Sequence, residues 1–213
     1  MSDPPLKITV DGTPYRIRGE TRSGEGIVLL HGWGGDEDVM WAFEHVLPDK
    51  TLILSPRAPY SIEEGGYEWI EVDSSRSSPA EAYRPGADDL VRFLERMRTT
   101  HGLIPAKTLL IGFSQGTALC LAGVQLGMLQ PAGIVVMAGF LPAGDDAPLS
   151  GLSVFWTHGR GDDVIPFDMA VEGTQRLRTV GADLTFCESR TAHKAGRECL
   201  RQLKAWIPAI LKV

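Results

Sequence analysis

The stretch "LLIGFSQGTALCLAG" at residues 109–123 joins an apolar run to a helix-like run through a Gly-x-Ser-x-Gly motif. The first run is typical of a buried strand, and the small residues after the motif are typical of a closely packed helix. A serine at a sharp strand-to-helix turn stands clear of the backbone, where its hydroxyl can act as a nucleophile. An ordinary glycine-rich turn can carry the same letters, so Ser114 is a candidate only if other residues support it.

Near-continuous apolar runs recur along the chain and predict further buried strands. They lie at 26–32, 51–57, 108–114, 133–139, 152–159 and 182–189, after two shorter strands near 6–10 and 14–20. Runs that are apolar at every position favour the central strands of a parallel sheet covered on both faces. Helix patterns lie between them, as at 86–101 and from about 194 onward, where Pro208 predicts a kink or a break. This alternation predicts an α/β protein with a mostly parallel sheet.

The segment 60–85 departs from this alternation. It is polar and rich in Ser, Glu, Gly and Pro, and it contains an isolated aromatic pair, Tyr67 and Trp69. A long irregular segment in a compact domain is often a pocket wall or a lid. A solvated loop anchored by two aromatic side chains fits the same pattern equally well.

The length and charge of the chain limit which classes of protein it can belong to. We expect the 213 residues to form a single domain over 1–213, with little room for a cap domain. The net charge of −6 and the scattered basic residues argue against binding to nucleic acid. The first ten residues lack the apolar core of a secretory signal, and no apolar run approaches the ~18 residues that span a bilayer.

The three cysteines, Cys120, Cys187 and Cys199, are widely spaced, and none belongs to a Cys-x-x-Cys pair. This pattern argues against a disulfide framework and against a zinc site. We therefore predict buried thiols in a reducing compartment, which means a cytoplasmic protein.

A serine hydroxyl is a weak nucleophile near neutral pH, so Ser114 needs partners elsewhere in the chain. A base must take its proton, an acid must orient that base, and fixed N–H groups must stabilise the oxyanion of the intermediate. Where such a turn tops an α/β sheet, the acid and then the histidine follow the serine along the chain.

The base is found by elimination among the five histidines, at positions 31, 45, 101, 158 and 193. His31 and His45 precede the serine, and His101 ends a predicted helix, where a cation favours the helix dipole. His158 comes before the best candidate acid. His193, between the last predicted strand and the last helix, is therefore the candidate base.

The acid is expected in "HGRGDDVIP" (158–166), where a predicted strand ends in two adjacent aspartates. The loops at strand ends are where an open parallel sheet gathers catalytic groups. We expect one of Asp162 and Asp163 to be the acid and the other to be a solvated turn residue.

The oxyanion donors are expected in "VLLHGWGGDED" (28–38), a predicted strand that runs into a glycine-rich loop. Glycines let the backbone approach a substrate closely and leave its N–H groups free. The loop lacks the Gly-Lys-Ser/Thr of a P-loop and the spacing of a dinucleotide fingerprint, which argues against phosphate binding.

With these residues in hand, the chain resembles the α/β-hydrolase carboxylesterase/phospholipase family, which includes the acyl-protein thioesterases. The resemblance covers nearly the whole chain and rests on "LLHGWGGDE", "SPRAPY" with "GGYEWIEV", "IGFSQG", "HGRGDDVIP" and "AHKAG". It implies an α/β-hydrolase fold with helices on both faces of the sheet. It also implies that Asp162 is the acid, that Trp33 and Gln115 supply the oxyanion N–H groups, and that a homodimer forms.

The chain departs from the family pattern at two places. Thr117 stands where the family usually has another glycine, and the first loop carries an extra glycine in Gly34-Gly35. The second departure leaves open whether Trp33 or Gly34 supplies the N–H group. The aromatic Trp69, with Tyr67 beside it, is expected to border the acyl pocket.

These residues predict a serine hydrolase that cleaves carboxylic esters or thioesters through Ser114, His193 and Asp162. Its substrate would be a small-molecule ester or thioester, and the chemistry needs no metal and no organic cofactor. Two alternatives stay open at this point. The same triad could transfer the acyl group to an acceptor other than water, or the fold could bind a ligand without catalysis.

Overall fold

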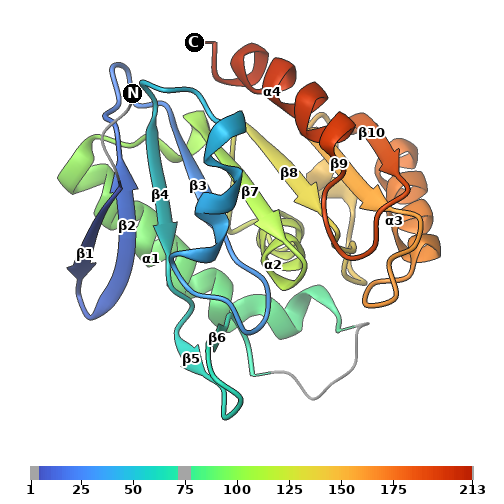
Figure 1. The fold of residues 1–213 in the computed structure, drawn as a ribbon, viewed down its shortest axis with the longest axis horizontal. Coiled ribbons are helices and arrows are strands. Elements are labelled where there is room, and N and C mark those ends of the chain that lie inside the picture. The colour runs from blue at the N-terminus through green and yellow to red at the C-terminus, as the bar shows by residue number, and fades with distance from the viewer. Residues whose placement is uncertain (1–4, 72–77, 213) are drawn as a thin grey trace.

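Among residues 5–71 and 78–212, which the computed structural model describes, eight strands form one sheet (Figure 1). The strand order is β1-β2-β4-β3-β7-β8-β9-β10. Their bounds are Leu6–Val10 (β1), Thr13–Arg18 (β2), Gly26–Leu30 (β3), Leu52–Pro56 (β4), Thr108–Phe113 (β7), Gly133–Met137 (β8), Ser153–Gly159 (β9) and Asp183–Ser189 (β10). β2 pairs antiparallel with β1 and β4, and all other neighbours are parallel, which confirms the predicted α/β architecture.

Helices cover both faces of this sheet. One face packs against α1 (Arg84–His101), α2 (Gln115–Gln125) and α3 (Phe167–Thr179). The other face packs against the 3-10 helix η1 (Val39–Val46) and α4 (Arg197–Leu211). Short 3-10 turns, η3 (Pro105–Lys107) and η4 (Ala147–Leu149), lie before β7 and β9. Because both faces are covered, β3, β4 and β8 are buried at every position, as their apolar runs predict.

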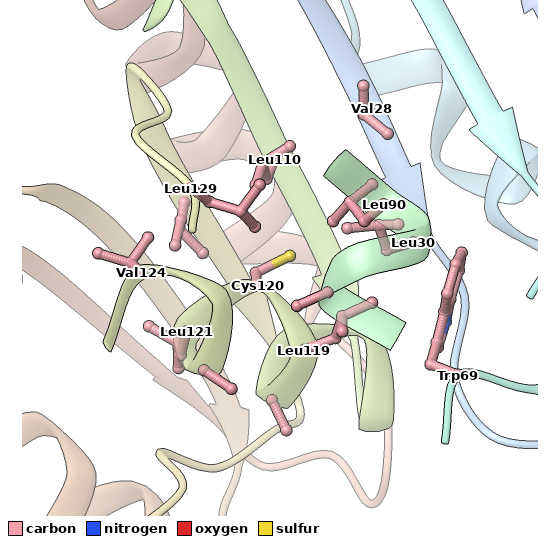
Figure 2. Close-up of a cluster of buried hydrophobic side chains, with 14 of the residues drawn as sticks. Val28, Leu30, Trp69, Leu90, Leu110, Leu119, Cys120, Leu121, Val124 and Leu129 are labelled. Carbon is pink, nitrogen blue, oxygen red and sulfur yellow. The ribbon is translucent and has the colours of Figure 1, made fainter. Parts of the chain in front are cut away.

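The helix α2 is buried all around, unlike the amphipathic α1 and α4. Leu119 and Leu121 lie in the same core as Leu110 of β7 and Leu90 of α1, and Trp69 stands at one side of this cluster (Figure 2). α2 therefore has little freedom to move, and Ser114 at its start is carried on a rigid support. In α4 the chain stays helical through Pro208 to Leu211, so the predicted break does not occur.

The segment that departs from the alternation contains a small hairpin, β5 (Tyr60–Ser61) with β6 (Tyr67–Glu68), and then η2 (Ala80–Tyr83). Part of that predicted segment, residues 72–77, lies outside the described residues. The described elements between β4 and α1 are therefore small, and no cap domain stands among them.

The cysteine prediction is wrong for two of the three residues. Cys187 of β10 and Cys199 of α4 form a disulfide, and only Cys120 is a buried thiol. Their Cα atoms lie 5.6 Å apart, within the range that a disulfide can bridge. Sequence spacing did not reveal this pair because the fold turns the chain back between β10 and α4. None of the helices in the described part of the chain is long and apolar enough to cross a membrane.

Candidate active site

The serine of the Gly-x-Ser-x-Gly motif lies at the sharp turn between β7 and α2. Ser114 has φ 49° and ψ −117°, a left-handed conformation that is costly for a residue with a side chain. The flanking glycines allow the turn, because a Cβ on Gly112 would lie 2.5 Å from the Thr117 nitrogen and one on Gly116 would lie 2.3 Å from the Leu30 oxygen. The motif is therefore a tightly packed strand-to-helix turn and not an ordinary loop.

Thr117, the first departure from the family pattern, fits the turn without disturbing it. Its hydroxyl donates to the Ser114 carbonyl at 2.6 Å. A Cβ on Gly139 would lie 1.6 Å from the Thr117 hydroxyl oxygen, so Gly139 provides the space that the threonine fills. The larger side chain at 117 is thus matched by the absence of one at 139.

His193 and Asp162 meet across two neighbouring loops. His193 Nδ1 lies 2.8 Å from Asp162 Oδ2, and the two side chains are 19% and 0% exposed. The other carboxylate oxygen accepts hydrogen bonds from the Val164 and Ile165 N–H groups at 3.0 and 2.8 Å. This carboxylate is held in a fixed position, and a histidine that donates from Nδ1 keeps Nε2 free as an acceptor.

The imidazole of His193 also packs on Phe113, the residue before Ser114, with ring centroids 4.9 Å apart. Among the described residues, the Ser114 hydroxyl has no hydrogen-bond partner. The structure therefore brings His193 onto Asp162 and beside the serine turn, without a hydrogen bond to the serine itself. Catalytic hydrogen bonds are often long before substrate binds.

The alternative acid, Asp163, and the alternative base, His158, do not occupy the positions of a catalytic pair. Asp163 is exposed, whereas Asp162 is buried. His158 is fully buried, and its Nε2 lies 2.9 Å from the Ile165 carbonyl and 3.4 Å from Asp162 Oδ2. Burial lowers the pKa of His158, which favours a neutral ring that supports the acid loop.

The glycine-rich loop after β3 is held by buried polar contacts. His31 is fully buried; its Nδ1 lies 2.7 Å from the Gly32 carbonyl, and its Nε2 accepts the Ala58 N–H at 3.0 Å. Burial lowers the pKa of His31, in keeping with a neutral ring that donates from one nitrogen and accepts at the other. A Cβ on Gly32 would lie 3.2 Å from the Ser114 Cβ, so this loop packs directly on the serine turn.

Within the same loop, the N–H groups have different partners. The Gly34 N–H donates to the Tyr67 carbonyl at 3.0 Å, and the Gly35 N–H donates to the Gly32 carbonyl at 3.1 Å. In the described part of the chain, neither the Trp33 N–H nor the Gln115 N–H donates a hydrogen bond. The extra glycine is thus used to pair the loop with β6, and Trp33 keeps a free N–H.

The two aromatic residues expected at the pocket occupy different environments. Tyr67 is half-buried, and its hydroxyl accepts from Arg57 Nη1 at 3.0 Å. Trp69 is only 2% exposed, and its indole N–H donates to the His31 carbonyl at 2.8 Å. With Arg57 and Phe93, Trp69 lines a cavity of about 300 Å³ beside α1, whose lining does not include Ser114.

A buried ion pair that the sequence did not reveal lies beneath the same loop. Glu37 is fully buried and receives Arg57 through two bonds, Nε to Oε2 at 2.6 Å and Nη2 to Oε1 at 2.8 Å. Lys7 also contacts this carboxylate. The sequence signals for this pair are weak: Arg57 ends a predicted buried strand, and Glu37 lies in the loop after another.

No group of three or more His, Cys, Asp or Glu side chains suited to a metal ion occurs in the part of the chain that the structure describes. The site instead offers a hydroxyl on a strained turn, an imidazole oriented by a carboxylate, and free backbone N–H groups. These are the groups that acyl transfer through a serine requires.

The comparisons with known proteins identify the family and the fold of the chain. The phospholipase/carboxylesterase family profile matches residues 17–211. A protein of Oryza sativa subsp. japonica named "Probable carboxylesterase" is 28% identical over 211 residues, covering 90% of this chain and 79% of its own. Acyl-protein thioesterase 1 of Debaryomyces hansenii is 24% identical, covering 87% of this chain and 91% of its own.

Among solved structures, the carboxylesterase from Mesorhizobium loti superposes with a TM-score of 0.83 at 18% identity, over 95% of this chain and 98% of its own. That likeness concerns the fold, and the profile match concerns the family. Since the profile extends over nearly all of the chain, from β2 to the end of α4, the protein belongs to the phospholipase/carboxylesterase family and is a carboxylic ester hydrolase of the α/β-hydrolase fold.

Proposed function

We propose that this protein hydrolyses carboxylic esters or thioesters through a triad of Ser114, His193 and Asp162 and an acyl-enzyme intermediate. One observation supports it most: the 2.8 Å contact between His193 and Asp162 lies beside a serine turn with the strained geometry of a nucleophile.

In the first half-reaction, Ser114 Oγ attacks the acyl carbon while His193 Nε2 takes the hydroxyl proton. The carbonyl electron pair moves onto oxygen, and the N–H groups of Trp33 and Gln115 bind the resulting oxyanion. The intermediate then collapses, and the leaving alcohol or thiol takes the proton from His193. Water repeats these steps on the acyl-enzyme and releases the acid.

The assignment of Trp33 over Gly34 is supported by the use of the Gly34 N–H in the contact with Tyr67. Tyr67 and Trp69 stay our candidates for the acyl site, Tyr67 through its half-exposed ring and Trp69 through the loop that it supports. Trp33 itself is 55% exposed and offers a further apolar surface next to the serine turn.

The test is hydrolysis of p-nitrophenyl esters with acyl chains from C2 to C16 by the wild type and Ser114→Ala. We expect the variant to lose at least ~1000-fold in kcat/KM, because the proposed triad then has no nucleophile. Ser153→Ala is the matched control and should keep its activity, because Ser153 begins β9, at the strand ends opposite those that carry the site. The preferred acyl length then gives the size of the acyl site, and matched thioesters and lysophospholipids give the leaving group.

Two outcomes would favour the alternatives. Turnover that requires an added acceptor would indicate an acyltransferase. An absence of turnover, together with a failure of a fluorophosphonate to label Ser114, would indicate a ligand-binding protein.

We further propose that one domain over residues 1–213 carries this activity. A homodimer and a cytoplasmic location stay predictions. The Cys187–Cys199 disulfide removes the cysteine part of the argument for that location.

A further inference from the structure

Trp69 contacts both halves of the oxyanion site that we proposed above. Its indole N–H donates to the His31 carbonyl at 2.8 Å, two residues before Trp33. Its backbone N–H donates to the Gln115 side-chain oxygen at 2.9 Å, and Gln115 is the residue that supplies the other proposed donor. A single residue therefore joins the loop after β3 to the first residue of α2.

The position of Trp69 is itself fixed. The residue is 2% exposed and belongs to the core around α2 (Figure 2). Its ring packs against the His31 ring at a tilt of 36°, with centroids 5.1 Å apart. Because Trp69 is packed into this core, its two hydrogen bonds can hold the His31 carbonyl and the Gln115 side chain at a fixed spacing.

We infer that Trp69 is a positioning residue for ester hydrolysis: it sets the spacing between the Trp33 and Gln115 N–H groups through its two hydrogen bonds. This inference rests on the proposed function, because it concerns the oxyanion site of that mechanism. Donors of this kind stabilise the transition state only when they lie at hydrogen-bond distance from the oxyanion, and a small displacement costs much of their effect.

The role differs from that of a residue that only fills the core. Substitution of a residue that only packs the core would change stability and substrate binding alike. Substitution of a positioning residue would weaken the stabilisation of the oxyanion in the transition state. Loss of the Trp69 hydrogen bonds should therefore lower kcat and leave KM nearly unchanged.

The chain offers a matched control for this test. Trp156 of β9 lies in the same core and is fully buried, but its indole N–H has no partner among the described residues. Trp69→Phe and Trp156→Phe thus remove the same atoms from similar surroundings, and only the first removes a hydrogen bond to the catalytic loop.

The experiment measures kcat and KM for the best p-nitrophenyl ester, together with the Ki of a trifluoromethyl ketone. The serine hydroxyl adds to the carbonyl carbon of such a ketone, and the carbonyl oxygen becomes an oxyanion in the site. For Trp69→Phe we expect kcat to fall about 10- to 100-fold, KM to change less than about 3-fold, and Ki to rise in proportion to the loss of kcat/KM. Trp156→Phe should stay within about 3-fold of the wild type in all three values.

A second variant keeps the test independent of how Trp69→Phe folds. Gln115→Met removes the acceptor of the other hydrogen bond while it keeps the Gln115 backbone N–H, and it should lower kcat and raise Ki in the same way. Thermal unfolding of each variant identifies any that do not fold.

The inference is overturned if folded Trp69→Phe and Gln115→Met match Trp156→Phe in kcat and Ki. It is also overturned if KM rises while Ki stays at the wild-type value. Both results are distinct from a failure of the proposed function, in which the wild type itself neither turns over esters nor is labelled at Ser114.

Discussion

Two loops flank the serine turn, and the protein fixes them by different means. The loop at 31–38, after β3, is held by buried hydrogen bonds from Ala58 and Trp69 and by the ion pair between Glu37 and Arg57. The loop at 190–196, which carries His193, lies between β10 and α4 (Figure 1). The Cys187–Cys199 disulfide joins those two elements.

Apart from the disulfide, the His193 loop depends on short-range polar contacts. The Gly161 N–H donates to the Thr191 carbonyl at 3.0 Å, and the Thr191 hydroxyl donates to the Lys194 carbonyl at 2.8 Å. Within the described ranges 5–71 and 78–212, this loop makes no buried ion pair like that of Glu37, and its carboxylate contact is the one between His193 and Asp162.

The difference indicates which conditions each loop withstands. A buried ion pair depends on the charge of a carboxylate and therefore on pH. A disulfide does not depend on that charge, but it depends on the redox state of the solution. The ion pair that holds the loop after β3 is thus sensitive to acid, and the disulfide beside the His193 loop is sensitive to reductant.

The largest effect is expected from the one charged contact of the His193 loop. Asp162→Asn should lower kcat by about 10⁴-fold, because an amide can donate to His193 Nδ1 and stabilise the wrong tautomer of the ring. Steady-state hydrolysis of a p-nitrophenyl ester measures this loss. Asp163→Asn, one residue away and exposed, is the control.

The control decides between the two aspartates. A similar loss in both variants would mean that the loop, and not the Asp162 carboxylate, is what His193 requires. A loss in Asp163→Asn alone would exchange their roles.

A smaller effect is expected from the disulfide. Its 12-residue separation corresponds to about 3 kcal/mol of unfolding free energy in the chain-entropy model. Urea unfolding with and without a thiol reductant measures this difference, and hydrogen exchange at 190–196 shows whether the His193 loop loosens. The double variant Cys187→Ala with Cys199→Ala should be insensitive to the reductant.

Thiol titration of the denatured protein supplies an independent check. One thiol, that of Cys120, should react before reduction and three should react afterwards. Three reactive thiols before reduction would show that the Cys187–Cys199 disulfide is not formed, and the His193 loop would then have no covalent support.

The residues of the candidate site and the contacts that hold them differ in how well the sequence predicted them. Ser114, Asp162 and His193 could be proposed because each follows a buried strand, and strand ends meet at one edge of a parallel sheet. The fold followed from the same apolar runs, and the structure confirms every strand that they predicted.

The supports of the site could not be predicted in this way. The bonds of Trp69 to His31 and Gln115 join residues that are 38 and 46 positions apart, and no local pattern encodes such contacts. The Cys187–Cys199 pair was missed for the same reason. Periodicity reports burial, whereas a pairing between distant side chains depends on the packed structure.

The smallest effect is expected at the buried ion pair. Burial alone would raise the pKa of Glu37, but the hydrogen bonds from Arg57 and Lys7 outweigh it and lower the pKa to about 2. Because the folded-state pKa lies below the unfolded value, this carboxylate adds stability above about pH 5, and that contribution is lost as the pH falls toward 2.

Glu37→Gln should therefore lower the free energy of unfolding by about 2 kcal/mol at pH 7. This is less than for a fully buried pair, because Arg57 and Lys7 are partly exposed and a glutamine oxygen still accepts a bond. Urea unfolding at pH 7 and at a series of lower values measures the change. Glu95→Gln, which breaks an exposed pair with Arg98, should cost less than about 0.5 kcal/mol.

The stabilities of the wild type and Glu37→Gln should converge as the pH falls, since the wild type then loses the charge that the variant already lacks. Convergence accompanied by slower ester hydrolysis in Glu37→Gln at pH 7 would tie the acid sensitivity to the loop after β3. A constant gap between the two proteins from pH 7 to 3 would show that the charge of Glu37 does not hold that loop, and the two loops would no longer differ in the way described.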